Sequence, residues 1–455
     1  MVSALLVRRG EVDGRVADVL VDGGRVTAVG PDLCPTGWPE TWDARGGAVL
    51  PGLHDHHLHL LAMAAAAGSL DLSAPADGVE AAVRRAVAAV EAGAWLRAVG
   101  HRAAGERLDR RRLDEWAGAV PVRVQDASGA LWILNSAALA AVAAAGTEVG
   151  ADAAESGWVL REDTALAQAW PAPPLDLAAV GQALTARGVT GVTDATPFAD
   201  PSGPELLAAA VADGRLPQRV VVTGQPSLSH AAGLTRGPAK IVIGDHHLPA
   251  LGDLAGLVAS SHAAGRPVAV HCVTVEALAL LLAAWADVGA WPGDRVEHGA
   301  VVPVAAIDAL ADLGVTVVTQ PGFVAERGDR YRAEVDVGEQ PDLWRCATLL
   351  AGGVRVAAGT DAPYGPADPW RAMAAAVDRC TPSGAVLGDD ERLTPERALG
   401  LFLGPADDPG GPARRVEPGA PADLCVLDRP RIEALADLSA VRVMATFVAG
   451  IAVPA

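Results

Sequence analysis

The chain has little cysteine and few basic side chains for its 455 residues. It holds five cysteines, an odd number, and no Cys-x-x-Cys pair, which excludes the disulfide framework of a small secreted protein and favours a reducing compartment. The 36 Lys and Arg residues against 55 Asp and Glu give a formal net charge of −19. A negative charge of this size argues against nucleic acid or an anionic membrane as the main partner.

Long apolar runs are also missing. The longest, near residues 60–67 and 277–286, fall well short of the ~20 residues that span a bilayer. The apolar stretch near the N-terminus is too short for the core of a signal peptide. With 51% hydrophobic and 20% charged residues, the composition also excludes intrinsic disorder. We therefore predict a folded cytoplasmic protein, whereas the sequence gives no indication of its oligomeric state.

Short apolar runs alternate with amphipathic helical stretches over most of the chain. We expect strands at residues 48–53, 188–195, 219–223, 239–243, 267–272, 294–298, 315–320 and 355–360. Strands that alternate with helices predict a parallel sheet. Eight such strands suit a closed (β/α)8 TIM barrel better than an open sheet, so the predicted fold class is α/β.

The two ends of the chain have a different pattern. Residues 1–49 and 406–455 carry short β-type runs broken by turns, such as Asp22-Gly23-Gly24. We predict that these ends form the two halves of a small β-sandwich beside a barrel at residues 50–405. The gap between the first and second barrel strands is too long for one helix, which predicts an insertion at about residues 68–178.

Four of the eleven histidines lie between residues 54 and 59. Because residues i and i+2 of a strand face the same side, His57 with His59, or His54 with His56, can offer two imidazoles to one metal ion. The spacing does not choose between the two pairs. A solvated histidine-rich loop would show the same spacing without binding a metal.

Further possible ligands follow later strands. His271 and His298 end two of the apolar runs, and Asp361 follows the last one. Since the active sites of barrels lie at the carboxyl ends of the strands, these side chains should meet the histidine pair at one rim. Imidazole and carboxylate ligands suit Zn²⁺, Mn²⁺ or Fe²⁺. The combined pattern predicts a metal site.

Lys240, the single lysine of the chain, lies in the apolar run 239–243. A buried amine is costly unless it is paired or neutral, and a neutral amine can take up CO₂ as a carbamate that bridges two metal ions. Arginine cannot do this because its guanidinium stays protonated. The alternative is that Lys240 reaches solvent, and its early position in the run favours that alternative. The surrounding ligands favour the carbamate.

The segment PGLHDHHLH at residues 51–59 resembles the PGxxDxHxH signature of the amidohydrolase superfamily. His271, His298 and Asp361 match the remaining ligands of that superfamily in order. GALWILNSAAL at residues 129–139 and GTDAP at 359–363 resemble the branch of the N-substituted formamide deformylases, amidohydrolase family 3. The resemblance covers nearly the whole chain. It assigns the first ligand pair to His57 and His59.

The resemblance implies a hydrolase that cleaves a non-peptide carbon–nitrogen bond of a small amide-type substrate by means of a metal-activated water. It implies one or two divalent ions, zinc in the first place, and Asp361 as proton shuttle. The implied metal ligands are His57, His59, Lys240, His271, His298 and Asp361. Asp55 is expected to orient a ligand. The expected substrate contacts are Trp132 and Asn135 of the insertion and Tyr331 and Arg345 after the seventh strand.

Two other functions stay open at this stage. One is a mononuclear aminohydrolase such as a nucleobase deaminase, which would share most of the ligands. Such enzymes typically carry Glu where this chain has Thr274, and they lack a carbamate lysine, so both Thr274 and Lys240 favour the binuclear amidase. The other is a barrel that binds a metabolite without turning it over.

Overall fold

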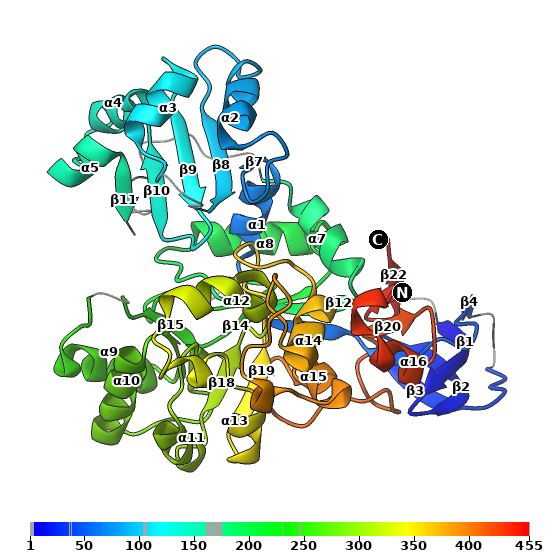
Figure 1. Cartoon of the computed structure of the whole chain (residues 1–455). Coiled ribbons are helices and arrows are strands. Elements are labelled where there is room, and N and C mark those ends of the chain that lie inside the picture. Colours follow the sequence, from blue (N-terminus) through cyan, green and yellow to red (C-terminus); the bar gives the residue numbers. More distant parts are fainter. Residues whose placement is uncertain are drawn as a thin grey trace. The chain divides into compact units, whose positions relative to one another are not determined.

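The computed structural model describes residues 4–35, 37, 39–102, 107–160, 166, 175–229, 231–244 and 247–454. Its chain divides into two compact units (Figure 1). The first unit consists of Met1–Leu60 together with Leu177–Ala455, and the second of Leu61–Asp176. Among the helices so described, none combines the length and the apolar character needed to cross a membrane.

Valine-rich runs form parallel sheets in the first unit. One sheet has the order β14-β13-β12-β6 and another the order β15-β16-β17-β18-β19, and each pairing within them is parallel. The strands are β6 (Leu53–Leu58), β12 (Val189–Asp194), β13 (Arg219–Val222), β14 (Thr235–Arg236), β15 (Ala239–Val242), β16 (Val268–Cys272), β17 (Arg295–His298), β18 (Thr316–Thr319) and β19 (Arg355–Ala358). Strands β6, β12, β17 and β18 are buried along their whole length, as parallel strands covered by helices should be. The predicted α/β class with parallel strands is confirmed.

Backbone hydrogen bonds also join these sheets at their edges. Lys240 N donates to Gly224 O at 2.8 Å, which connects β15 with the segment after β13. Asp361 N donates to His57 O at 2.7 Å, which connects the segment after β19 with β6. The carboxyl end of β6 therefore lies beside the carboxyl end of β19, although the two are far apart in the sequence.

The strand expected at residues 48–53 is divided in the structure. Val49–Pro51 forms β5, which pairs with β20 (Leu424–Leu427) in a sheet of the chain ends. The parallel strand β6 starts only at Leu53 and includes three histidines and an aspartate. The sequence pattern placed this strand too early because its polar residues do not look like a buried strand.

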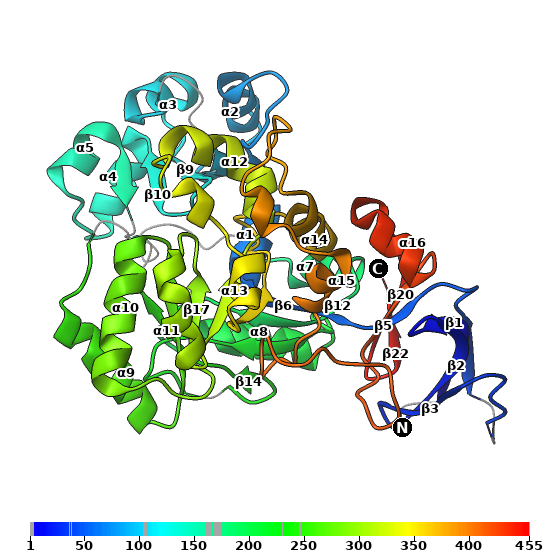
Figure 2. The same ribbon diagram turned by 60° about the horizontal axis from the view of Figure 1, so that its bottom comes forward.

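Helices connect the parallel strands of the first unit. They are α7 (Leu177–Thr185), α8 (Ser202–Ala212), α9 (Leu251–Ala263), α10 (Val275–Val288), α11 (Ile307–Asp312), α12 (Gly322–Glu334), α13 (Ala347–Ala351), α14 (Pro369–Asp378) and α15 (Pro395–Gly400). Local sequence fixes their starts: the hydroxyl of Thr274 accepts from Ala277 N at the start of α10, and Asp368 caps α14, which begins with Pro369. Helices α9 and α10 pack side by side, as Figure 2 shows.

The chain ends form ladders that share a core and are antiparallel except for the parallel pair β1 and β4. One sheet has the order β3-β2-β1-β4 and another the order β22-β21-β20-β5. The remaining elements are β1 (Leu5–Val12), β2 (Arg15–Asp22), β3 (Arg25–Gly30), β4 (Glu40–Asp43), α16 (Arg431–Ala436), β21 (Val443–Val448) and β22 (Ile451–Val453). Val7 and Val19 from the N-terminal part share one buried cluster with Leu424 and Phe447 from the C-terminal part.

The second unit contains a mixed sheet of order β11-β10-β9-β8-β7, in which β7, β8 and β9 run parallel. Its elements are β7 (Leu70–Asp71), α2 (Val79–Val87), β8 (Leu96–His101), α3 (Arg110–Ala117), β9 (Val122–Asp126), β10 (Leu131–Leu134), α4 (Ser136–Ala144), α5 (Ala151–Ser156) and β11 (Trp158–Leu160). Helix α1 (Leu60–Ala67) begins where the first unit ends. Leu113, Val124 and Ile133 belong to the core of this unit.

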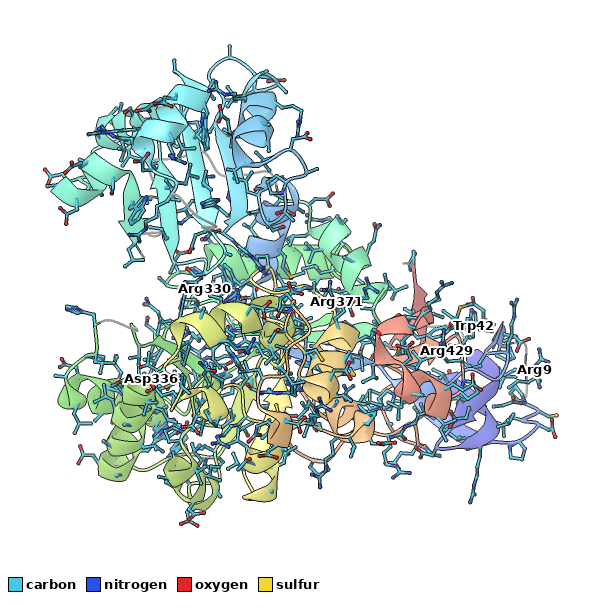
Figure 3. The ribbon with its side chains drawn as sticks, viewed as in Figure 1. Arg9, Trp42, Arg330, Asp336, Arg371 and Arg429 are labelled. Atoms are coloured by element: carbon cyan, nitrogen blue, oxygen red, sulfur yellow. The ribbon has the colours of Figure 1, made fainter. Side chains whose placement is uncertain are left out.

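Charged side chains of the first unit fall into an exposed and a buried group. Arg9 pairs with Asp43, and Arg330 pairs with Glu334 at 2.6 Å, both at the surface; Arg9 and Arg330 are labelled in Figure 3. Exposed pairs of this kind contribute little to stability. Buried charged groups are costly and need a specific reason. Asp194 at the end of β12 and Asp361 just after β19 are two such groups.

Candidate metal centre

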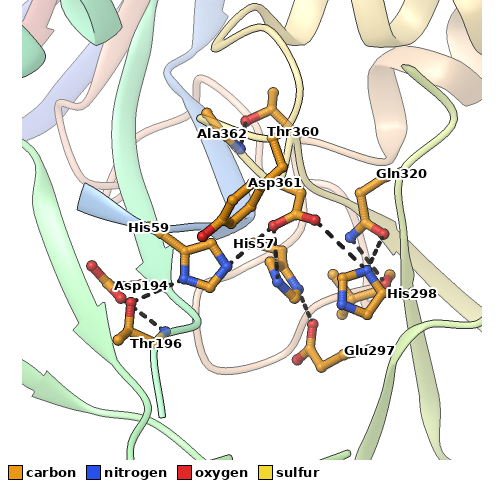
Figure 4. Close-up of polar contacts among 12 residues, drawn as sticks. His57, His59, Asp194, Thr196, Glu297, His298, Gln320, Thr360, Asp361 and Ala362 are labelled. Atoms are coloured by element: carbon orange, nitrogen blue, oxygen red, sulfur yellow. Dashed lines mark hydrogen bonds and ion pairs between the residues drawn. The ribbon is translucent and has the colours of Figure 1, made fainter. Parts of the chain in front are cut away.

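Three parallel strands bring potential metal ligands to one place (Figure 4). The ligand atoms of His57, His298 and Asp361 all lie within 4.8 Å of one another. Oδ1 of Asp361 is 3.1 Å from Nε2 of His59 and 3.5 Å from Nε2 of His57. The ring of His271 is 4.4 Å from the ring of His298. The structure thus brings five of the predicted ligands together.

Burial sets the charge of these groups. It lowers the pKa of His57 and of His298 well below the usual value, so both imidazoles are neutral, which is the state that binds metal. Burial alone would raise the pKa of Asp361, but the hydrogen bond with His59 and the nearby His57 and Lys240 bring that pKa below its usual value. The cluster therefore presents neutral imidazoles and an ionised carboxylate, the donor set of a divalent metal site.

Lys240, the sixth predicted ligand, is 4% exposed. Its Nζ has no hydrogen-bond partner among the residues that the structure describes. Burial lowers the pKa of Lys240, and the carboxylates of Glu297 and Asp361 oppose this effect. An unpartnered buried amine beside the carboxylate of a ligand cluster fits a role in holding a metal.

The backbone at the cluster is strained. His298 has φ of 71° and Asp361 has φ of 54°, a region that side chains other than glycine rarely occupy. The hydrogen bond from Asp361 N to His57 O holds this conformation. Gly359 permits the close approach, because a Cβ there would lie 2.5 Å from the backbone nitrogen of His57. Strain that the surrounding structure enforces is typical of functional sites.

Comparison with known proteins agrees with this geometry. The sequence model of the amidohydrolase family matches residues 40–454. The chain belongs to the amidohydrolase family. The predicted resemblance is thereby confirmed, and membership makes the protein a metal-dependent hydrolase of non-peptide carbon–nitrogen bonds.

Relatives of this amidohydrolase cover its full length. The N-substituted formamide deformylase of Arthrobacter pascens is 27% identical over 512 aligned positions, which cover 95% of this chain and 94% of that protein. An uncharacterized metal-dependent hydrolase of Pyrococcus horikoshii has a similar structure, with a TM-score of 0.75, 20% identity, and coverage of 94% and 98%. N-isopropylammelide isopropylaminohydrolase of Burkholderia multivorans follows with a TM-score of 0.57, 18% identity, and coverage of 99% and 98%. At 20% identity or less, these structural similarities are evidence for the fold alone.

Asp55 of the amidohydrolase links the two segments that carry the ligands. Its carboxylate accepts hydrogen bonds from Thr360 N at 3.0 Å, from Thr360 Oγ1 at 2.6 Å and from His57 N at 3.2 Å. It touches the backbone of His57, not its imidazole. Burial raises the pKa of Asp55 to about 7 although these hydrogen bonds act in the opposite direction.

The other histidine pair of β6 does not join the cluster. Nε2 of His54 lies 3.0 Å from Oγ1 of Thr193, and the rings of His54 and His56 are 4.5 Å apart. Burial lowers the pKa of both well below the usual value. They are neutral, buried residues outside the group of clustered ligand atoms.

Two predicted substrate residues of the first unit have structural partners. The guanidinium of Arg345 pairs with Glu391 at 2.8 Å and with Asp342, and it donates to Val302 O at 2.8 Å. Tyr331 packs against Trp344. These partners account for Arg345, so the structure gives no support to its predicted contact with substrate.

The two predicted substrate residues of the second unit also have local roles. Oδ1 of Asn135 accepts from Val122 N at 2.9 Å and from Ala138 N at 3.0 Å, and its Nδ2 donates to Val120 O at 2.9 Å. Asn135 is therefore the N-cap of α4. Trp132 is buried in an apolar cluster of the same unit. The cap and the packing explain both residues without a substrate.

Sequence reasoning missed the residues that form hydrogen bonds with the ligand imidazoles. Nδ1 of His57 is hydrogen-bonded to Glu297, and Nδ1 of His298 to Gln320 Oε1 at 2.8 Å. Nδ1 of His59 lies 2.9 Å from Thr196 Oγ1. Polar residues at the ends of apolar runs were the available signal. Which histidine each of these polar residues contacts depends on the register between strands.

Proposed function

We propose that this amidohydrolase cleaves the amide bond of small N-substituted formamides or closely related amides. The observation that carries the proposal is the cluster of neutral His57 and His298 with ionised Asp361 at strand ends. The relative from Arthrobacter pascens, which aligns with 95% of the chain, supports the substrate class.

We further propose the architecture that this chemistry needs. The parallel strands close into one (β/α)8 barrel at residues 50–405, with an insertion at about 68–178, and the chain ends at 1–49 and 406–455 form a β-sandwich. The hydrogen bonds from Lys240 N to Gly224 O and from Asp361 N to His57 O support closure. The core shared by both chain ends supports the sandwich.

The donor set suits zinc, with one or two ions per chain. His57, His59, His271, His298 and Asp361 would hold them, together with Lys240, as an amine or as its CO₂-derived carbamate. A bound divalent ion lowers the pKa of water to about 7 and polarises a carbonyl group. The five cysteines are free, which supports action in a reducing compartment such as the cytoplasm.

Side chains of the protein carry out the proton transfer and favour a particular kind of substrate. The carboxylate of Asp361, kept ionised by His59, accepts a proton from the attacking water and passes it to the leaving amine. An apolar cluster that includes Ala300, Val301 and Phe323, with Tyr364 packed against it, follows the strand ends. The ring of Tyr364 lies 5.5 Å from the ring of His59. These side chains favour a substrate whose nitrogen carries an apolar substituent.

Metal content and a matched substrate panel test the proposal. We expect bound zinc and the release of formate from N-alkyl and N-aryl formamides, with slower turnover of the corresponding acetamides. Release of ammonia from nucleobases, with one ion per chain, would instead identify a deaminase. A zinc-loaded protein that hydrolyses neither class would be a metabolite-binding barrel.

A further inference from the structure

A buried carboxylate behind the metal centre has no part in the reaction proposed above. Glu297 lies on β17 directly before His298, and it is fully buried. Its Oε2 is hydrogen-bonded to Nδ1 of His57 (Figure 4). Its Oε1 lies 2.5 Å from Nε of Arg295. Among the described residues, the clustered ligand atoms come from His57, His298 and Asp361. Glu297 therefore contacts a ligand without belonging to the cluster.

This contact determines which ring nitrogen of His57 carries the proton. A carboxylate oxygen of Glu297 is the natural acceptor in this contact, so Nδ1 of His57 is the donor and carries the proton. The lone pair then lies on Nε2, which is 3.5 Å from Oδ1 of Asp361. A neutral imidazole that turns its lone pair toward the cluster is the form that binds a divalent metal.

Two other imidazoles of the cluster have neutral hydrogen-bond partners. His59 meets the hydroxyl of Thr196, and His298 meets the amide oxygen of Gln320. Charge-assisted hydrogen bonds are about twice as strong as neutral ones. A carboxylate behind a ligand histidine also raises its basicity. The contact with Glu297 is thus the strongest of the three.

Arg295 holds the carboxylate from the other side. It is 2% exposed, so the pair of Arg295 and Glu297 lies wholly in the interior. When one partner of a buried pair is removed, the other is left as an uncompensated charge. Two roles of Glu297 must therefore be separated: it neutralises the charge of Arg295, and it orients His57.

We propose that Glu297 is a positioning residue of the metal centre, which fixes the tautomer and orientation of His57 and thereby tightens metal binding. The inference rests on the proposed metal-dependent function, because it concerns the same site. It is independent of the identity of the substrate.

Zinc affinity tests this role without any assay of turnover. We expect Glu297→Gln to bind Zn²⁺ about 10–100-fold more weakly than the unchanged protein, measured by competition with a chromophoric chelator. Glu391→Gln is the matched control, since Glu391 is also buried and pairs with an arginine, Arg345, at 2.8 Å. The control should bind zinc as the unchanged protein does. Equal zinc affinity in Glu297→Gln and the unchanged protein would overturn the inference.

A double variant separates the two roles and guards against misfolding. Arg295→Met with Glu297→Gln removes both charges, and apolar replacement of a buried pair is often tolerated. Zinc binding that stays weak in the double variant supports orientation of His57. Recovery of normal affinity would show that Glu297 only balances Arg295. If the unchanged protein binds no zinc, the proposed metal-dependent function fails, and this inference fails with it.

Discussion

At the scale of single residues, the site depends on which buried groups stay charged. Asp361 is buried and still has a lowered pKa, because its contact with His59 and the nearby His57 and Lys240 outweigh the effect of burial. Because the carboxylate of Asp361 is ionised at neutral pH, it can accept a proton from a reacting group. Proton transfer of this kind typically contributes 10²–10⁴-fold to a rate, by order of magnitude.

Asp361→Asn should therefore lose about 10²-fold or more in kcat and keep its fold. The amide has nearly the same shape, but it cannot accept the proton. Steady-state kinetics together with the melting temperature check this, and Asp336→Asn at an exposed position serves as control. A near-normal kcat in the Asp361 variant would refute the shuttle.

Lys240→Arg should leave the chain unable to hold a second metal ion. Arginine keeps the positive charge but cannot form a carbamate. Elemental analysis of the purified variant should find at most one ion per chain where the unchanged protein holds two. Two ions in both proteins would remove the argument for a modified lysine.

Sequence alone located the residues that end an apolar run, such as His298, because a polar residue there is visible in the pattern. It did not locate Glu297 or Gln320 as partners of particular histidines. Glu297 meets His57 across 240 positions of sequence, through the register of the folded strands. Asn135 and Arg345 were predicted from the sequence to contact substrate. In the structure, Asn135 caps a helix and Arg345 forms an ion pair.

At the scale of elements, the decisive contact is between β6 and the segment after β19. Gly359 lies against the backbone of His57, and the strained Asp361 follows two residues later. The sequence pattern revealed both segments as parts of an α/β fold. The barrel prediction brought both to one rim, but it did not give the backbone contact between them, because that contact depends on the register of strands that are distant in the chain.

Gly359→Ala should separate these segments. The added Cβ would come within 2.5 Å of His57 N, so the backbone must shift. We expect a loss of about 2–4 kcal/mol in the free energy of unfolding and weaker zinc binding, measured by denaturant titration and chelator competition. Gly256→Ala is the control, because it meets open space inside α9 and should stabilise the protein by up to about 1 kcal/mol. Equal stability of the two variants would contradict this account.

At the scale of the whole molecule, the metal centre belongs entirely to the first unit. The residues proposed as ligands lie on or just after strands of that unit, while the second has its own sheet and its own core. The sequence indicated a long segment that interrupts the strand pattern. Its internal sheet was not predicted, because short runs such as 131–134 carry no clear period.

Bound zinc should therefore slow amide hydrogen exchange more in the first unit than in the second. Binding to the folded state stabilises it by about 4 kcal/mol at a thousandfold excess over Kd. We expect zinc to slow amide hydrogen exchange in β6 and β17 and to leave β9 and β10 nearly unchanged, as peptide-level mass spectrometry can measure. Equal protection of both units would show that they unfold as one.

The ligand positions also bear on how the protein acquires its metal. His57 lies near the start of the chain, and Asp361 lies beyond its third quarter. The ribosome must synthesise the chain past residue 361 before the cluster can form. The early histidines therefore lack Asp361 during most of translation. Metal loading is then a late step in biogenesis, and the ions available at that moment, more than ligand type, decide which one the finished enzyme carries.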